Sequence, residues 1–215
     1  MIQFKLVLLG DSSVGKSSIV TRFVKDQFDI NKESTIGAAF LSQTIKLLDS
    51  ETNDEVAVKF EIWDTAGQER YKSLAPMYYR NSNAAIVVYD ITDANSLSKA
   101  VKWVNELKEK LGDDNDCVIS LIGNKLDLIN EDETKRAISR REGEEFAIEN
   151  GLYFHEVSAK ENIGIKDIFQ EIGESLYNQH KEKKLKNATT ISRNGGNSNV
   201  ELNRPSTNDA TSCCS

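Results

Sequence analysis

Residues Gly10 to Ser17, GDSSVGKS, fit the pattern G-x-x-x-x-G-K-[ST] at every defined position. In a segment of this kind, backbone N–H groups cradle phosphates, a lysine adds positive charge and a hydroxyl is available to Mg²⁺. Lys16 is that lysine, and Ser17 carries that hydroxyl. The alternative is a glycine-containing turn that binds nothing, but the match is complete. The pattern therefore predicts a site for a nucleoside triphosphate.

The segments on either side of this loop support the same prediction. Residues 2–9 are a short apolar run typical of a strand, and residues 18–24 carry apolar residues at helical spacing. A strand, a glycine loop and a helix start place the N–H groups at the positive end of a helix dipole.

Two later polar segments, Asn124-Lys125-Leu126-Asp127 and Ser158-Ala159-Lys160, each follow a strand-like apolar run. Ligands of parallel sheets bind at the carboxyl ends of the strands. The carboxylate of Asp127 can accept hydrogen bonds from both N1–H and the exocyclic amine of guanine, a pair that adenine lacks. Lys125 can lay its stem along the base, and the second segment can close over it. A polar turn at a strand end is the alternative for either segment alone; together they predict guanine.

Strand-like and helix-like segments alternate along the chain. We expect strands at 2–9, 40–48, 56–63, 84–89, 117–123 and 152–157, and helices at 18–24, 96–111, 139–150 and 165–176. The turn-rich segment 49–55 predicts an antiparallel hairpin, whereas most other connections are long enough to be helical crossovers. The expected fold is α/β: a six-stranded, mostly parallel sheet with one antiparallel strand and helices on both faces.

Composition limits the class of protein. The 215 residues are 39% hydrophobic and 28% charged, which suits one globular domain with a tail. A net charge of −7 argues against nucleic acid as a partner. The chain starts directly in a strand pattern, so we expect no secretion signal, and three cysteines suit a reducing compartment. Asn, Ser, Thr and Gly dominate from about Asn187, so we expect a domain at 1–180 and a flexible tail at 181–215.

In this order, the motifs resemble those of the Ras superfamily of small GTPases, over roughly residues 2–180: Gly10–Ser17, Thr35, Asp64–Gly67, Asn124–Asp127 and Ser158–Lys160. The resemblance implies GTP and GDP as bound nucleotides and Mg²⁺ as cofactor, with Ser17 and Thr35 as metal ligands and Asp64 acting through water. It further implies that Phe28 packs against the base, that the N–H of Gly67 contacts the γ-phosphate and that Gln68 orients the attacking water. The candidate nucleotide-binding residues are Ser12, Ser13, Val14, Gly15, Lys16, Ser17, Ser18, Phe28, Thr35, Asp64, Gly67, Asn124, Lys125, Asp127, Ser158, Ala159 and Lys160.

The resemblance also implies an activity. We expect slow intrinsic hydrolysis of GTP that a partner protein accelerates, with the loops of Thr35 and Gly67 released when the γ-phosphate is lost. Ser13 stands where Ras itself has a glycine. The alternatives are a protein that holds GTP without hydrolysing it and an ATP-dependent kinase; Gln68 disfavours the first, and the segment Asn124–Asp127 disfavours the second.

Within the superfamily the chain is similar to Rab proteins, through residues 63–71, WDTAGQERY, and 78–80, YYR. Phe40, Trp63 and Tyr78 match the aromatic triad that Rab effectors contact, although such aromatics could also merely fill the groove under the loops. Residues 33–40 and 71–79 resemble the corresponding segments of the early-endosome subgroup of Rabs. The hairpin loop 49–55 is longer than we expect for that subgroup. The resemblance implies a role in endosomal transport, with another trafficking step as the alternative. Implied partners are an exchange factor, an activating protein, a GDP-dissociation inhibitor and effectors, around a monomeric domain.

The tail ends Cys213-Cys214-Ser215, which is not a C-a-a-X box. It resembles the paired-cysteine ending of Rabs, which receive two geranylgeranyl groups. Two lipid chains anchor stably where one binds marginally, so the pair has a physical purpose; two idle thiols are the alternative. The expected location is the cytoplasmic face of endosomal membranes, in exchange with the cytosol.

Overall fold

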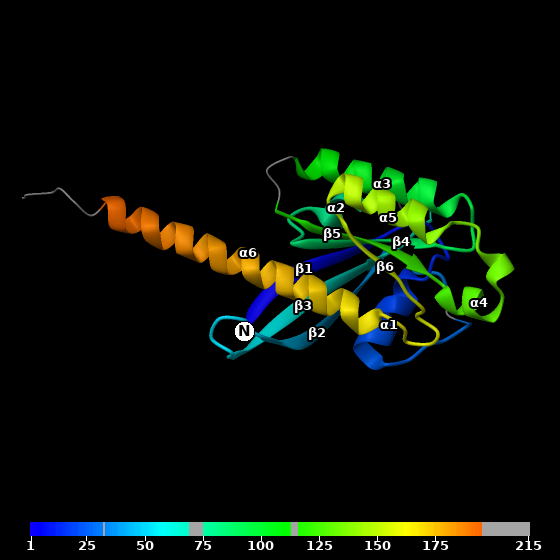
Figure 1. Cartoon of the computed structure of the whole chain (residues 1–215), viewed down its shortest axis with the longest axis horizontal. Coiled ribbons are helices and arrows are strands. Elements are labelled where there is room, and N and C mark those ends of the chain that lie inside the picture. The colour runs from blue at the N-terminus through cyan, green and yellow to red at the C-terminus, as the bar shows by residue number, and fades with distance from the viewer. Residues whose placement is uncertain (32, 69–74, 113–115, 195–215) are drawn as a thin grey trace, which may run out of the picture. The chain divides into compact units, whose positions relative to one another are not determined.

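A computed structural model describes residues 1–31, 33–68, 75–112 and 116–194, and for residues 187–194 it describes the backbone only. Helices and strands alternate along most of these residues (Figure 1). In chain order they are β1 (Ile2–Leu9), α1 (Lys16–Lys25), β2 (Ala38–Leu48), β3 (Glu55–Thr65), α2 (Ala75–Tyr79), β4 (Ala84–Asp90), α3 (Ser96–Leu111), β5 (Val118–Asn124), α4 (Leu126–Glu131), the 3₁₀ turn η2 (Glu133–Lys135), α5 (Arg140–Asn150), β6 (Tyr153–Glu156) and α6 (Ile165–Asn194).

The six strands form one sheet in the order β2-β3-β1-β4-β5-β6. β2 and β3 pair antiparallel from Ala38 opposite Thr65 to Leu48 opposite Glu55, and every other pair is parallel. The turn-rich segment makes a hairpin because its two flanking strands follow each other directly, whereas parallel neighbours need a crossover. The expected α/β fold is confirmed.

Helices cover both faces of the sheet (Figure 1). Because successive side chains of a strand point to opposite faces, Leu6 and Leu8 of β1 enter one buried cluster while Val7 and Leu9 enter the other. The first cluster packs against α1 and the start of α6, and the second against α2, α3 and α5. The central strands are buried on both faces. This packing holds in place the edge of the sheet at which β1, β3, β4 and β5 end.

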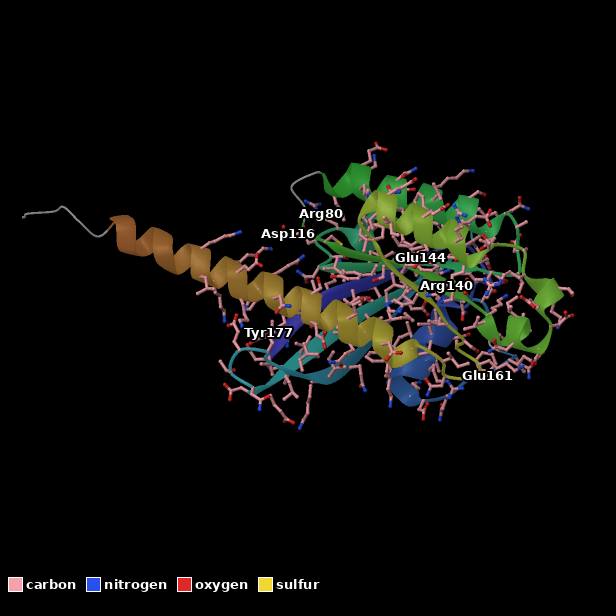
Figure 2. All side chains as sticks on the ribbon, in the orientation of Figure 1. Arg80, Asp116, Arg140, Glu144, Glu161 and Tyr177 are labelled. Carbon is pink, nitrogen blue, oxygen red and sulfur yellow. The ribbon has the colours of Figure 1, made fainter. Side chains whose placement is uncertain are left out.

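The β2–β3 hairpin and α6 meet at Asp49, which is only 4% exposed. Its Oδ1 accepts hydrogen bonds from the backbone N–H groups of Glu51 and Thr52. Its Oδ2 accepts one at 2.5 Å from the hydroxyl of Tyr177, which is labelled in Figure 2. The longer hairpin loop is therefore held at its base by one carboxylate.

The two ends of α5 follow the sequence prediction. Ser139 and Glu142 form the reciprocal capping box, and Gly151 ends the helix in the left-handed region at φ 66°.

The chain divides into a compact unit, Met1–His180, and a second unit, Lys181–Ser215. Helix α6 continues to Asn194, beyond Asn187, where composition predicted that a tail begins. Once a helix has nucleated, each further residue adds a hydrogen bond at low cost. Amino-acid composition alone does not indicate how far such a helix extends. Within the described part of the chain, the helices are too short or too polar to cross a membrane.

Candidate functional site

The phosphate-binding loop connects β1 to α1 in a backbone conformation that requires its glycines. Gly10 and Gly15 have φ values of 139° and 97°. A Cβ atom at Gly10 would lie 2.4 Å from the carbonyl oxygen of Val88, and one at Gly15 would lie 2.2 Å from Nδ2 of Asn124. The loop can therefore pass this close to β4 and β5 only because neither position carries a side chain.

Lys16 is buried at the first position of α1. Its Nζ donates hydrogen bonds to the carbonyl oxygens of Gly10 at 2.9 Å and Asp11 at 2.8 Å. Burial lowers the pKa of the ammonium to about 8, and the nearby carboxylates of Asp64 and Asp11 partly oppose this. The loop thus holds a desolvated positive charge at a place where the negative charge of phosphate oxygens would balance it.

Two segments on the other side of the loop approach Lys16 and its neighbour Ser17. Oγ of Ser17 lies 2.7 Å from Oγ1 of Thr35. Asp64, near the end of β3, is 3% exposed. These three oxygen-bearing side chains fit a hard cation such as Mg²⁺, which prefers oxygen ligands and keeps water among them.

Gly67 lies directly against the phosphate-binding loop. A Cβ atom there would lie 2.4 Å from the carbonyl oxygen of Asp11 and 2.5 Å from Nζ of Lys16. The N–H of the preceding Ala66 donates to the carbonyl of Gly37 at 2.8 Å, which links this segment to the loop that carries Thr35. The two segments are therefore joined by a direct backbone hydrogen bond.

At the base end, Asn124 connects two loops that are far apart in sequence. Its Nδ2 donates to the carbonyl of Val14 at 2.9 Å, and its Oδ1 accepts from the N–H of Ala159 at 3.2 Å. Oδ1 of Asp127 accepts from the hydroxyl of Ser158 at 2.6 Å, so the carboxylate is oriented by the second loop. The same hydroxyl of Ser158 accepts a hydrogen bond at 3.0 Å from the backbone N–H of Glu161, which is labelled in Figure 2.

A cavity of about 410 Å³ joins the two ends. Most of the predicted residues line it: Ser12, Ser13, Gly15, Lys16, Ser17, Ser18, Phe28, Thr35, Gly67, Gln68, Asn124, Lys125, Asp127, Ala159 and Lys160. Val14, Asp64 and Ser158 do not; all three are buried, and Val14 and Ser158 hydrogen-bond to residues that line the cavity.

Sequence reasoning missed six of the lining residues: Asp29, Ile30, Glu33, Ser34, Thr65 and Leu128. The first four lie between the predicted Phe28 and Thr35, and the other two adjoin motif residues. In the sequence, only their position between or beside motif residues indicated that they line the cavity.

The predicted aromatic triad is brought together. The ring centroids of Phe40 and Trp63 lie 5.3 Å apart, and those of Trp63 and Tyr78 lie 5.7 Å apart. Phe40 is 55% exposed although it is a large apolar residue. Cys213 and Cys214 lie outside the described residues, as do 69–74 of the segment after Gln68.

These features define the class of protein: an α/β protein whose strand–loop–helix phosphate site and two base-end loops form one nucleotide-sized cavity. The chain belongs to the Ras family, whose model matches residues 5–178. It is 58% identical to the GTP-binding protein YPT52 of Saccharomyces cerevisiae, with all of both chains covered. It is 51% identical to the GTP-binding protein ypt5 of Schizosaccharomyces pombe, covering 99% of this chain and 93% of the relative. The resemblance seen in the sequence is confirmed.

Proposed function

We propose that this protein is a Rab-type GTPase that binds GTP, hydrolyses it to GDP and phosphate, and acts as a molecular switch in endosomal trafficking. The observation that carries this proposal is the single cavity of about 410 Å³ in which the phosphate-binding loop, Thr35, Gln68 and the base-end loops converge. Two relatives that align with it over nearly their full lengths are named GTP-binding proteins.

At the phosphate end, the backbone N–H groups of residues 12–18 and the ammonium of Lys16 bind the phosphates. Phosphoryl transfer needs positioning and charge neutralisation more than covalent help. The buried ammonium meets the second need, since low local dielectric strengthens its attraction for the γ-phosphate.

At the base end, Asp127 accepts the two N–H groups of guanine while Phe28 and the stem of Lys125 contact the faces of the ring. Ser158 holds the carboxylate of Asp127 in place at 2.6 Å. Ala159 and Lys160 complete this end of the cavity.

Mg²⁺ is the cofactor that these residues fit, with Ser17 and Thr35 as direct ligands and Asp64 acting through water. When bound, Mg²⁺ neutralises charge on the phosphate oxygens. Gln68 orients the attacking water. Without a partner, hydrolysis is slow, on the order of 10⁻⁴ to 10⁻³ s⁻¹.

Loss of the γ-phosphate releases Thr35 and Gly67, which changes the surface near Phe40, Trp63 and Tyr78. Effectors read this surface in the GTP state. An exchange factor, an activating protein and a GDP-dissociation inhibitor control the cycle, and the GTPase domain is a monomer.

Geranylgeranyl groups on Cys213 and Cys214 anchor the chain to the cytoplasmic face of endosomal membranes, from which it cycles to the cytosol. Replacing both cysteines by serine should turn an endosomal signal of the tagged full-length protein into a diffuse one. An unchanged location would refute the lipid anchor, and a signal on another organelle would refute the endosomal assignment.

Single-turnover hydrolysis of GTP in Mg²⁺ tests the enzymatic proposal. We expect Gln68→Leu to lower the rate at least tenfold, whereas Gln170→Leu, a matched change at an exposed residue of α6, should have no effect. Equal rates in the wild type and Gln68→Leu would favour a GTP-binding scaffold with negligible hydrolysis. Preferential retention of ATP would instead favour a kinase.

A further inference from the structure

Asp90, the last residue of β4, lies next to Lys125 although the two are far apart in the chain. Oδ2 of Asp90 is 2.6 Å from Nζ of Lys125, and the side chain of Asp90 is 12% exposed. β4 and β5 pair in parallel with Asp90 opposite Asn124, the residue that precedes Lys125. The order of the strands therefore creates this contact.

The carboxylate of Asp90 is itself fixed by neighbours. Its Oδ1 accepts hydrogen bonds from the backbone N–H of Thr92 at 2.9 Å and from the hydroxyl of Thr92 at 2.7 Å. The N–H of Asp90 donates to Oγ of Ser96 at 2.8 Å, at the start of α3. With Oδ1 occupied in this way, Oδ2 is directed at the ammonium of Lys125 in one geometry.

Lys125 lies in a conformation that is uncommon for a residue with a side chain. Its φ is 76°, in the left-handed region, where the chain turns from β5 into α4. Its side chain lines the cavity together with Phe28 and Asp127. A lysine side chain has much rotamer freedom, and a charged partner at its tip confines the four-carbon stem that leads to it.

We propose that Asp90 is a positioning residue for the nucleotide: its carboxylate holds the ammonium of Lys125 so that the lysine stem forms a fixed wall against the purine ring. This inference rests on the proposed function, because it assigns a role within the same site. The stem touches the face of the ring and not its hydrogen-bonding edge. It therefore contributes equally to every purine, and base selection is left to Asp127.

The rate of GDP release from the full chain tests this role. Asp90→Asn keeps the shape of the side chain and removes its charge, and we expect release to be about tenfold faster, the lower end of the effect of losing a hydrogen bond to a charged group, because the amide can still accept one. Asp93→Asn is the matched control, since this exposed carboxylate accepts only a local bond from the N–H of Asn95 at 2.9 Å among the contacts described. Lys125→Met keeps most of the stem and removes the ammonium, so it should also speed release about tenfold.

A double-mutant cycle separates positioning from a structural role. If Asp90 acts through Lys125, Asp90→Asn adds little to Lys125→Met, and the pair together remains about tenfold faster than the wild type. A hundredfold effect of the pair would overturn the proposal, because Asp90 would then act independently of the lysine. If Asp90→Asn does not fold, unchanged release from Lys125→Met alone would overturn it as well.

Release of inosine diphosphate provides the second readout. The ratio of GDP to inosine diphosphate release rates should be the same in Asp90→Asn and in the wild type, and should change in Asp127→Asn. A changed ratio in Asp90→Asn would contradict a role limited to the ring face. Failure of the wild type to retain GDP over ADP would refute the proposed function itself. Additive effects of Asp90→Asn and Lys125→Met would instead refute only the role of Asp90.

Discussion

Replacing Asn124 by alanine should loosen nucleotide binding. The side chain bridges the carbonyl of Val14 in the phosphate-binding loop and the N–H of Ala159 in the base loop. Asn124 is 3% exposed, so both partners lose a hydrogen bond in a buried setting. Each unsatisfied buried group costs about 1–3 kcal/mol, and the two together about 2–4 kcal/mol if one relaxes partly.

This cost falls mainly on the nucleotide-bound state. We expect a bound nucleotide, which would span both loops, to keep them together, and we expect the loops of the nucleotide-free chain to separate more readily and to take hydrogen bonds from water. The release rate should therefore rise by about 30- to 1000-fold, since each 1.4 kcal/mol is a factor of ten.

Displacement of a fluorescent GDP analogue by excess GDP measures the release rate directly. Asn105→Ala is the matched control because it removes the same amide from an exposed position of α3. A release rate for Asn124→Ala within threefold of that control would refute the bridging role. An equal loss of thermal stability in the nucleotide-bound and nucleotide-free states would refute the assignment of the cost to the bound state.

Three further predictions concern the framework around the site. Arg136→Ala should lower the free energy of unfolding by about 3–5 kcal/mol, because its guanidinium bonds at 2.6 and 3.0 Å to Glu156, whose side chain is 2% exposed; denaturant unfolding with no loss would contradict this. Gly143→Ala should cost about 1–3 kcal/mol, because the added carbon would lie 2.5 Å from the hydroxyl oxygen of Tyr89; Tyr89→Phe should recover part of the loss in a thermal melt. Burial raises the pKa of the Cys117 thiol to about 12, so at pH 8 alkylation of the folded chain, with the tail cysteines replaced, should be about a thousandfold slower than of the unfolded chain and should rise with pH. Similar rates in the two states would be the contrary result.

The sequence predicted the parts of the site that depend on local spacing. The phosphate-binding loop lies between a strand and a helix, as the apolar run 2–9 and the helical pattern after Ser17 predicted. Likewise, the base-end segments follow buried strands, and parallel strands bring their carboxyl ends to one edge of the sheet. The hairpin and the cap of α5 also depend on neighbours in sequence.

Contacts that depend on the order of strands were not predictable in this way. Asp90 holds Lys125 only because β4 lies next to β5, and alternation of strands and helices does not determine that order. Lys99 of α3 reaches Asp11 of the phosphate-binding loop at 2.5 Å because β4, which precedes α3, lies next to β1, which precedes the loop. The polar composition from about Asn187 shows that few side chains there can be buried, but it does not show where a helix ends. The extension of α6 to Asn194 was therefore not predicted.

The base preference of the purified full chain tests the central claim most directly. We would measure how GTP, xanthosine triphosphate and ATP compete with labelled GDP, for the wild type and for Asp127→Asn. The account predicts that only GTP competes effectively in the wild type. In the variant the preference should pass to xanthosine triphosphate, because the amide donates where the carboxylate accepted. Effective competition by ATP in the wild type, or an unchanged preference in the variant, would contradict the account of a guanine-nucleotide switch.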